Sequence, residues 1–194
     1  MVPPAPAPTD LAVRAVPLAV AGCLELPLEP SSDRRGSFVK LFQASSFTEA
    51  GVAFEVRELF VSRSRRGVLR GLHYQGPPSD VAKVVCCLDG AVLDAVVDLR
   101  VGSPTYRQHC IVELSADRPV ALFVPCGCAH GFLATDDHTL VAYLQSGEHD
   151  PVHEGGVLWS SVGIDWGTAD VILSDRDATF PPLAALESPF RFAN

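Results

Sequence analysis

The sequence predicts an all-β protein with a few short helices, built as one antiparallel sandwich or barrel. Short apolar runs, each closed by Gly, Pro, Asp or Ser, recur along most of the chain. After residue 12 no repeat, linker or change in composition divides it, and 194 residues suit a single all-β unit. We therefore expect a flexible Pro/Ala-rich tail at residues 1–12 and a single domain at 13–194.

The predicted strands are rich in Val, Leu and Phe, which suit a pleated, half-buried surface. In chain order they are FVKLF (38–42), VLRGLHY (68–74), AKVVCCLDG (82–90), AVLDAVVDLRVGSP (91–104), CIVELSADRP (110–119), VALFVPCG (120–127), GFLATDD (131–137), TLVAYLQSG (139–147) and GVLWSS (156–161). The Asp-Gly pair at 89–90 predicts a tight hairpin between two of these runs. One helix is predicted at 45–52, with Ser45 or Ser46 as its cap and Glu49 in its first turn.

The charge of the chain excludes one class of partner and leaves another open. The formal net charge is -8, whereas a protein that wraps a nucleic acid by bulk charge needs an excess of Lys and Arg. Arginines nevertheless gather in the first half of the chain, so a local basic pocket for a small anion is expected. They are Arg34, Arg35, Arg57, Arg63, Arg65, Arg66 and Arg70.

Six cysteines lack any CxxC pair, which favours buried or partly buried thiols in a reducing compartment. Residues 20–23, VAGC, look like a lipoprotein cleavage box, but Arg14 and two prolines interrupt the segment before it and no basic head precedes it. No apolar run reaches membrane-spanning length. We expect a cytoplasmic protein without lipidation or membrane contact.

The segment VPCGCAHGF at 124–132 contains the P-x-G-x-x-H pattern that, in cupin barrels, points a histidine into the cavity. Metal-binding cupins also need an earlier H-x-H and a carboxylate, because a catalytic metal takes about three protein ligands. Only His73 stands in the earlier region, so the metal set is incomplete. The alternative that stays open is a metal-dependent cupin whose ligands are His73, His130 and either Cys126 or Glu113.

A second segment, GVLRGLHYQGPPSDVAKVV at 67–85, carries His73 and Lys83 between apolar runs. Both side chains either converge on a pocket or lie at the surface of a hairpin with a Gly-Pro-Pro turn. A general base needs a neutral imidazole, commonly oriented by a carboxylate on its other nitrogen. Asp175 and Asp177, in LSDRDATFPPL, are the candidates for that carboxylate, and the residues alone do not choose between them.

In this order these motifs resemble the dTDP-4-dehydrorhamnose 3,5-epimerase family, the RmlC-like sugar-nucleotide epimerases of deoxysugar biosynthesis, over about residues 20–185. The landmarks are DRRGSF (33–38), GVLRGLHYQ (67–75), AKVV (82–85), DAVVDLRVGSPTY (94–106), VPCGCAHGFL (124–133), VAYLQSGEHDP (141–151), IDW (164–166) and LSDRD (173–177). The resemblance implies a cupin-type jelly roll that works as a homodimer without a metal or other cofactor. It also implies an isomerase that inverts C3, C5 or both of a nucleotide-linked 4-keto-6-deoxyhexose.

The resemblance further assigns roles to individual residues. His73 matches the catalytic base and Asp177 its carboxylate partner, while Lys83 matches the lysine that stabilises the enolate. Tyr143 matches the acid that returns a proton to the opposite face, and His130 a second pocket histidine. Each residue also has a purely structural alternative. His73 could be a hydrogen-bonded core histidine and Asp177 a turn cap. Lys83 could be a solvated strand end and Tyr143 an aromatic strand residue.

Substrate binding is assigned in the same way. Arg35 and Arg70 match positions that grip the diphosphate, and Phe38 lies in the same motif as Arg35. The chain departs from the family pattern at three further binding positions, which are Glu58, Phe60 and His149, and also at Lys40. These departures predict a changed nucleotide, such as CDP or GDP, or a changed deoxysugar. A third hypothesis is a non-catalytic nucleotide-sugar binder on the same barrel.

Overall fold

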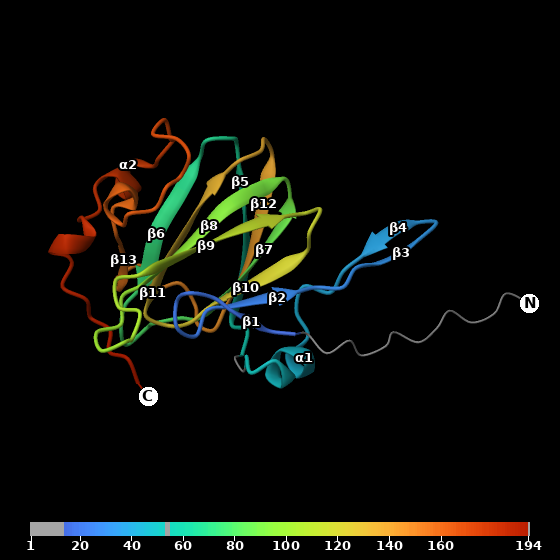
Figure 1. Cartoon of the computed structure of the whole chain (residues 1–194), viewed down its shortest axis with the longest axis horizontal. Helices are drawn as coiled ribbons and strands as arrows, with labels where there is room; N and C mark the ends of the chain where they lie inside the picture. Colours follow the sequence, from blue (N-terminus) through green and yellow to red (C-terminus); the bar gives the residue numbers. More distant parts are fainter. Residues whose placement is uncertain (1–13, 53–54, 194) are drawn as a thin grey trace, which may run out of the picture.

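A computed structural model of the chain describes residues 14–52 and 55–193, and it consists mainly of strands in two facing sheets (Figure 1). In order across the sheet, the six-stranded sheet contains β1 (Val16–Pro17), β2 (Leu24–Pro27), β10 (Val120–Val124), β7 (Lys83–Asp89), β12 (Thr139–Gln145) and β5 (Glu58–Ser64). The five-stranded sheet contains β13 (Glu154–Gly156), β6 (Leu69–Gln75), β11 (Cys128–Ala134), β8 (Ala91–Asp98) and β9 (His109–Ser115). Its strand pairs are antiparallel, as are those of the first sheet.

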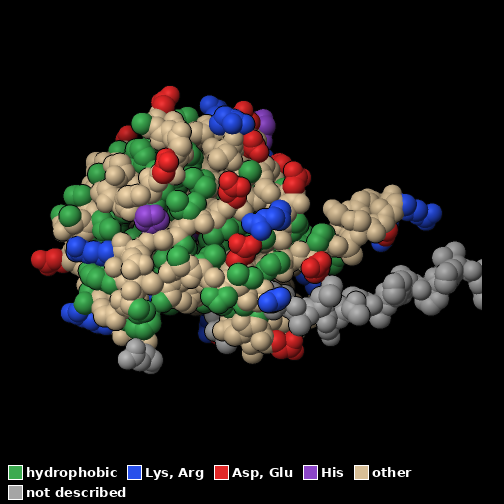
Figure 2. Space-filling view, viewed as in Figure 1, with side chains coloured by type: hydrophobic (Ala, Val, Ile, Leu, Met, Phe, Trp, Pro, Cys, Tyr) green, Lys and Arg blue, Asp and Glu red, His purple; other side chains and the backbone are tan. Residues whose placement is uncertain are grey.

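The smaller elements lie around these sheets. A separate hairpin, β3 (Ser31–Asp33) with β4 (Gly36–Phe38), stands away from the body of the molecule, with basic side chains at its tip (Figures 1 and 2). The helices are α1 (Ala44–Glu49) and α2 (Asp175–Ala178), and two 3-10 turns span Trp159–Ser161 and Leu183–Ala185. In the described part of the chain, no helix is long and apolar enough to cross a membrane.

Three apolar clusters explain why the strand sequences are nearly continuous hydrophobic runs. The inner cluster packs one sheet against the other and includes Val85 and Phe132. The second cluster covers the outer face of the five-stranded sheet with residues near the C-terminus, such as Trp166, and the third covers the other sheet with Phe47 of α1. Strands buried on both faces need apolar residues at successive positions rather than at alternate ones. This is the predicted all-β jelly roll.

The hairpin predicted at Asp89–Gly90 is wrong. The two residues join β7 to β8, but β7 pairs with β10 and β12, whereas β8 pairs with β9 and β11. The turn therefore carries the chain from one sheet to the other. Gly90 has a φ of +70°, and a Cβ there would lie 2.7 Å from Oγ1 of Thr139, so this turn between the sheets needs a glycine. A hairpin turn commonly needs a glycine too, which is why the sequence pattern does not distinguish the two.

Other predicted boundaries also differ from the structure. The helix begins at Ala44 rather than Ser45, its cap residue Gln43 makes no side-chain capping bond, and Glu49 is its last residue. The strand predicted at 38–42 ends at Phe38, and in the segment predicted at 156–161 only Gly156 is in a strand, whereas Trp159–Ser161 form a 3-10 turn. The predicted tail at residues 1–12 lies outside the described residues. All six cysteines are free thiols, and only Cys126 is not fully buried.

Candidate active site

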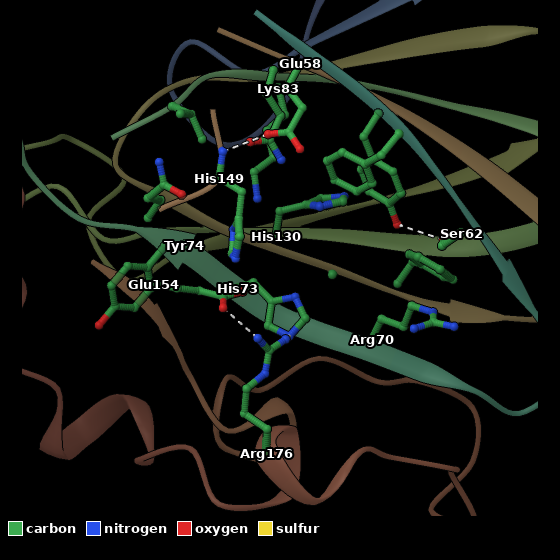
Figure 3. A pocket seen from close by; sticks show the side chains of 17 residues that line it. Glu58, Ser62, Arg70, His73, Tyr74, Lys83, His130, His149, Glu154 and Arg176 are labelled. Carbon is green, nitrogen blue, oxygen red and sulfur yellow. Dashed lines mark hydrogen bonds and ion pairs between the residues drawn. The ribbon is translucent and has the colours of Figure 1, made fainter. Parts of the chain in front are cut away.

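A cavity of about 410 Å³ opens between the two sheets, and most of the predicted site residues line it (Figure 3). Strands of both sheets contribute, since β5, β7 and β12 form one wall and β6 and β11 the other. Eight of the eleven predicted residues line the cavity: Glu58, Phe60, Arg70, His73, Lys83, His130, Tyr143 and His149. Asp177 lies just behind His73, whereas Arg35 and Phe38 do not reach this cavity.

His73 and Asp177 form a hydrogen-bonded pair. Nε2 of His73 lies 2.9 Å from Oδ1 of Asp177, and the backbone N–H of Gly71 donates to Oδ2 at 3.0 Å. Ser174 caps α2 by accepting a hydrogen bond from the backbone N–H of Asp177, and this cap holds the carboxylate beside β6. Burial alone would raise the pKa of Asp177, but the hydrogen bond and charge of His73 hold it well below the usual range. Of the two candidate acids, Asp177 is therefore the one bonded to His73.

Arg176 is a site residue that the sequence analysis missed. Its Nη2 lies 3.0 Å from Nε2 of His73, its Nε donates to Oδ1 of Asp177 at 3.2 Å, and its Nη1 donates to Oε2 of Glu154 at 2.7 Å. Figure 3 shows this guanidinium reaching up to the histidine from below the cavity. The signal available in the sequence was only its position next to Asp177.

His130 forms a second pair with a fully buried acid, Asp94. Nε2 of His130 lies 2.9 Å from both carboxylate oxygens of Asp94 on the neighbouring strand β8. Burial raises the pKa of Asp94 even though His130 and Lys83 oppose the shift. His130 also lies directly opposite His73 in the β6–β11 register, so strand pairing alone brings both rings to one place. The aspartate in the middle of the apolar run AVLDAVV (91–97) was the signal for this partner.

Tyr143 projects from β12 into the same cavity. Its hydroxyl lies 3.4 Å from Oγ of Ser62, the contact drawn to Ser62 in Figure 3. Its ring stacks on Phe60 and meets the edge of His130. Burial raises the pKa of Tyr143, and the hydrogen bond with Ser62 only partly opposes this shift. The phenol is therefore held protonated.

A model of the dTDP-4-dehydrorhamnose 3,5-epimerase family matches residues 17–185. The chain belongs to this family. A dTDP-4-dehydrorhamnose 3,5-epimerase of Mycolicibacterium smegmatis is 42% identical over 173 residues, which cover 88% of this chain and 86% of that protein. A dTDP-4-dehydrorhamnose 3-epimerase of Streptomyces niveus is 40% identical over 168 residues, covering 85% and 81% of the two chains.

Solved structures of the family agree with the fold. The crystal structure of a Legionella pneumophila epimerase in complex with dTDP-4-keto-L-rhamnose superposes with a TM-score of 0.89 at 31% identity, covering 94% of this chain and all of that one. A 4-keto-6-deoxy sugar epimerase from the novobiocin gene cluster of Streptomyces spheroides has a TM-score of 0.84 at 39% identity, covering 89% and 88% of the two chains. The chain is thus an isomerase of the nucleotide-sugar epimerase type, as the motifs predicted.

Two predicted binding residues of this epimerase lie far from its own cavity. Arg35 and Phe38 belong to the β3–β4 hairpin, where the Arg35 side chain is 84% exposed and Phe38 is 63% exposed. Arg35 pairs only with Asp33 of the same hairpin, as far as the described residues show. In the structure, neither residue lines the pocket of its own chain.

The ligands of the metal-dependent alternative are not assembled in this epimerase. Within residues 14–52 and 55–193, no group of three or more His, Cys, Asp or Glu side chains is arranged to hold a metal ion. Glu113 lies on β9 with an exposed side chain, and Cys126 does not line the cavity. Only His73 and His130 of that predicted set come together, each bonded to its own carboxylate.

Proposed function

We propose that the protein inverts C3, C5 or both of a dTDP-linked 4-keto-6-deoxyhexose. The observation that carries the proposal is that the two proton-handling residues belong to opposite sheets. His73 belongs to the five-stranded sheet and Tyr143 to the six-stranded sheet that faces it. A sugar ring between the sheets would meet a base on one face and an acid on the other. Inversion needs this arrangement, because a single group on one face returns the proton to the side it left.

The first step is removal of a proton next to the C4 ketone by His73. A carboxylate only accepts, so the contact with Asp177 places the proton of the neutral imidazole on Nε2, and the nearby Arg176 nitrogen is then a charged neighbour of Nε2 and not its hydrogen-bond donor. The structure gives Nδ1 no polar contact with the described residues, so Nδ1 is the nitrogen that takes the proton. Asp177 accepts from Nε2–H, holds this tautomer and stabilises the imidazolium that forms. The electron pair of the broken C–H bond passes to the ketone oxygen and gives an enolate.

Lys83 supplies the positive charge that the enolate oxygen needs. Its side chain lines the cavity from β7 and is the only lysine among the described residues that do so, so its ammonium offers a positive charge beside the sugar. Burial lowers the pKa of Lys83 to about 8, while Glu154 and Asp94 oppose the shift. At neutral pH the side chain stays protonated.

Tyr143 completes the inversion. Its O–H bond breaks, the proton forms a new C–H bond on the face opposite His73, and the enolate returns to the ketone. The raised pKa of the buried phenol suits this role, because the group keeps its proton until a strong base such as an enolate is present. His73 then loses a proton and Tyr143 regains one by exchange with water, which restores the enzyme.

The relatives favour dTDP as the nucleotide, against the change predicted from the departures at Glu58, Phe60 and His149. Relatives at about 40% identity carry dTDP-linked names. We expect thermal-shift measurements with dTDP, UDP, CDP and GDP to give the largest rise in melting temperature with dTDP, since a ligand that binds only the native state stabilises it. A selective rise with CDP or GDP would contradict the dTDP assignment and leave the epimerase chemistry intact.

We also propose that the enzyme works as a homodimer in which each β3–β4 hairpin serves the partner's pocket. The hairpin stands away from its own body (Figure 2), so Arg35 meets a diphosphate only if a second copy brings its cavity to it. A guanidinium is suited to this task because it makes paired, charge-assisted contacts with phosphate oxygens.

Solvent deuterium tests the reaction. Incubation of the enzyme with dTDP-4-keto-6-deoxyglucose in heavy water should place deuterium at each inverted carbon, and mass spectrometry and NMR would count and locate the label. His73→Asn should lower the exchange rate by about a thousandfold, the usual contribution of a positioned base. A wild-type enzyme that binds dTDP but exchanges no proton would support a non-catalytic binder instead. Exchange that is lost to a chelator and regained with a metal ion would support the metal-dependent alternative.

A further inference from the structure

We infer that Phe60 is a positioning residue for Tyr143, which orients the phenol so that its proton arrives on the face opposite His73. The inference rests on the proposed function, and it adds a residue whose part in the reaction is indirect. Phe60 lies on β5 directly opposite Tyr143 on β12 in the antiparallel register. Their ring centroids are 4.7 Å apart and the planes differ by 13°, so the two rings lie flat against each other.

The hydroxyl of Tyr143 is held only weakly at its own end. Its contact with Ser62 is 3.4 Å long, beyond the usual range of O–H···O hydrogen bonds. A tyrosine side chain moves its oxygen mainly by swinging the whole ring, and a bond of this length resists that swing poorly. The direction of the O–H group therefore depends on what contacts the ring faces and edges.

Tyr143 belongs to the inner apolar cluster, and its two aromatic contacts among the described residues are with Phe60 and His130. The ring centroids of His130 and Tyr143 are 6.1 Å apart and the ring planes differ by 75°, which is an edge-to-face contact. The hydrogen bond with Asp94 holds His130 in place. Phe60 covers a face of the tyrosine ring from the edge strand of the six-stranded sheet, lines the cavity and is 37% exposed to solvent. Without Phe60, the tyrosine ring would be free to tilt toward the space that opens on this side.

The base and the electrophile do not depend on Phe60. His73 is held by Asp177 and Gly71 on the other sheet, and Lys83 lies on β7, beyond β12 from β5. Loss of the stack should therefore leave proton removal in place and impair proton return to the opposite face. The expected signature is exchange without inversion, which a general loss of folding or of substrate binding does not produce.

The experiment measures deuterium incorporation and inversion together in heavy water, with dTDP-4-keto-6-deoxyglucose as substrate. At saturating substrate, Phe60→Ala should lower the number of inversions per exchange event by about tenfold, and this ratio does not depend on how the loss of a cavity-lining ring changes substrate binding. Phe60→Tyr keeps a flat ring in the stack and should restore the wild-type ratio. Val61→Ala is the matched control, because Val61 follows Phe60 on the same strand with its side chain 54% exposed and does not line the cavity.

Two results would overturn the inference. In the first, Phe60→Ala keeps both inversion and exchange at wild-type rates; in the second, both rates fall by the same factor, and in each case the ratio of inversion to exchange is unchanged. Either result leaves the proposed function standing, whereas a wild-type enzyme without exchange removes the proposed function itself. If Phe60→Ala does not fold, Phe60→Leu retains an apolar side chain on β5 without the flat ring, and the same ratio decides.

Discussion

The Lys83 ammonium sits among groups that pull its pKa in opposite directions. Burial lowers the pKa to about 8, and the negative charges of Glu154 and Asp94 limit the shift. The charged form is the one that stabilises an enolate, so the active fraction of the free enzyme falls as the pH rises through this value. We expect kcat/KM to be steady near pH 7 and to decline above about pH 8.

Glu154→Gln provides a second measurement on the same group. Removing the nearby negative charge takes away part of what keeps Lys83 protonated, so the decline in kcat/KM should begin at a lower pH than in wild type. The profiles of both enzymes, measured by deuterium exchange from pH 6 to pH 10, check this. A decline that stays in place or moves to higher pH in the variant would show that another group controls it.

Single residues also mark how far the sequence could predict the site. A base that needs a carboxylate partner was predictable from residue chemistry, but the choice between Asp175 and Asp177 was not. The two acids differ in which side of a four-residue helix they occupy, and only the docking of α2 against β6 turns Asp177 toward His73. Arg176 was missed for the same reason, since its contacts with His73 and Glu154 join three separate elements.

At the scale of elements, the close approach of β6 and β11 holds the two histidines opposite each other. Gly71 has a φ of +129°, and a Cβ there would lie 2.7 Å from Cα of Gly131 and 3.0 Å from the carbonyl oxygen of His130. These are backbone atoms, which cannot move aside as a flexible side chain does. The glycine is therefore required both for its conformation and for the space it leaves.

Gly71→Ala should lower the free energy of unfolding by about 3 kcal/mol or more, because it combines backbone strain with a steric clash. Gly67→Ala is the matched control on the same segment. Gly67 also has a positive φ, +82°, but a Cβ there would meet nothing within 4 Å, so its cost should be about 1 kcal/mol. Denaturant unfolding of both variants gives the comparison, and equal losses would contradict the role of the contact with β11.

The β3–β4 hairpin allows a test of shared active sites. Arg35→Ala and His73→Asn should each impair the enzyme, the first by weakening diphosphate binding and the second by removing the base. If each hairpin serves its partner, a mixed dimer contains one site with both residues intact. Equal mixing with subunit exchange should then restore about a quarter of the wild-type activity, since about half of the dimers are mixed.

Absence of recovery in the mixture would place Arg35 outside the shared site. A monomer in light scattering would remove the dimer proposal altogether. Phe60→Ala is not suitable for this experiment, because it alters the pocket rather than the hairpin. The unchanged parent enzyme, exchanged with itself, controls for activity lost during mixing.

Elements show a second limit of prediction from the sequence. Most strands were found because their apolar runs are buried on both faces, but their partners were not, as the wrong hairpin at Asp89–Gly90 shows. Strand β5 was missed, since it is an edge strand with a largely exposed and partly charged sequence. The missed strand carries Phe60 and Ser62, so the wall around Tyr143 could not be derived before the pairing was known.

Across the whole molecule, the loop after β8 ties the two ends of the described chain together through Asp98. Asp98 accepts hydrogen bonds from Arg100, Ser103 and Thr105, and Arg100 donates in turn to the carbonyl of Ala21 near the start of the six-stranded sheet. Backbone bonds between Val101 and the C-terminal segment 190–192 complete the connection. A change in the charge of Asp98 should therefore affect the stability of the entire fold rather than one strand.

Burial alone would raise the pKa of Asp98, but the hydrogen bonds from Arg100, Ser103 and Thr105 outweigh it and hold the pKa below its usual range. A carboxyl with a lowered folded-state pKa contributes stability that is fully present above its unfolded pKa of about 3.9. That stability is lost as the pH falls from there through the folded value. The free energy of unfolding should therefore drop below about pH 4.

Asp98→Asn tests this origin of the acid sensitivity. The variant should lose about 3 kcal/mol at pH 7, because buried Arg100 keeps its charge without an ionic partner. Below pH 4 its stability should fall less steeply than that of wild type, by up to about 1.4 kcal/mol per pH unit for the proton that Asp98 no longer takes up. Ser103→Ala removes one hydrogen bond to Asp98, so its stability at pH 7 and its loss of stability below pH 4 should lie between those of Asp98→Asn and wild type. Denaturant unfolding from pH 3 to pH 8 decides, and identical slopes in Asp98→Asn and wild type would assign the acid sensitivity to other carboxyls, Asp177 among them.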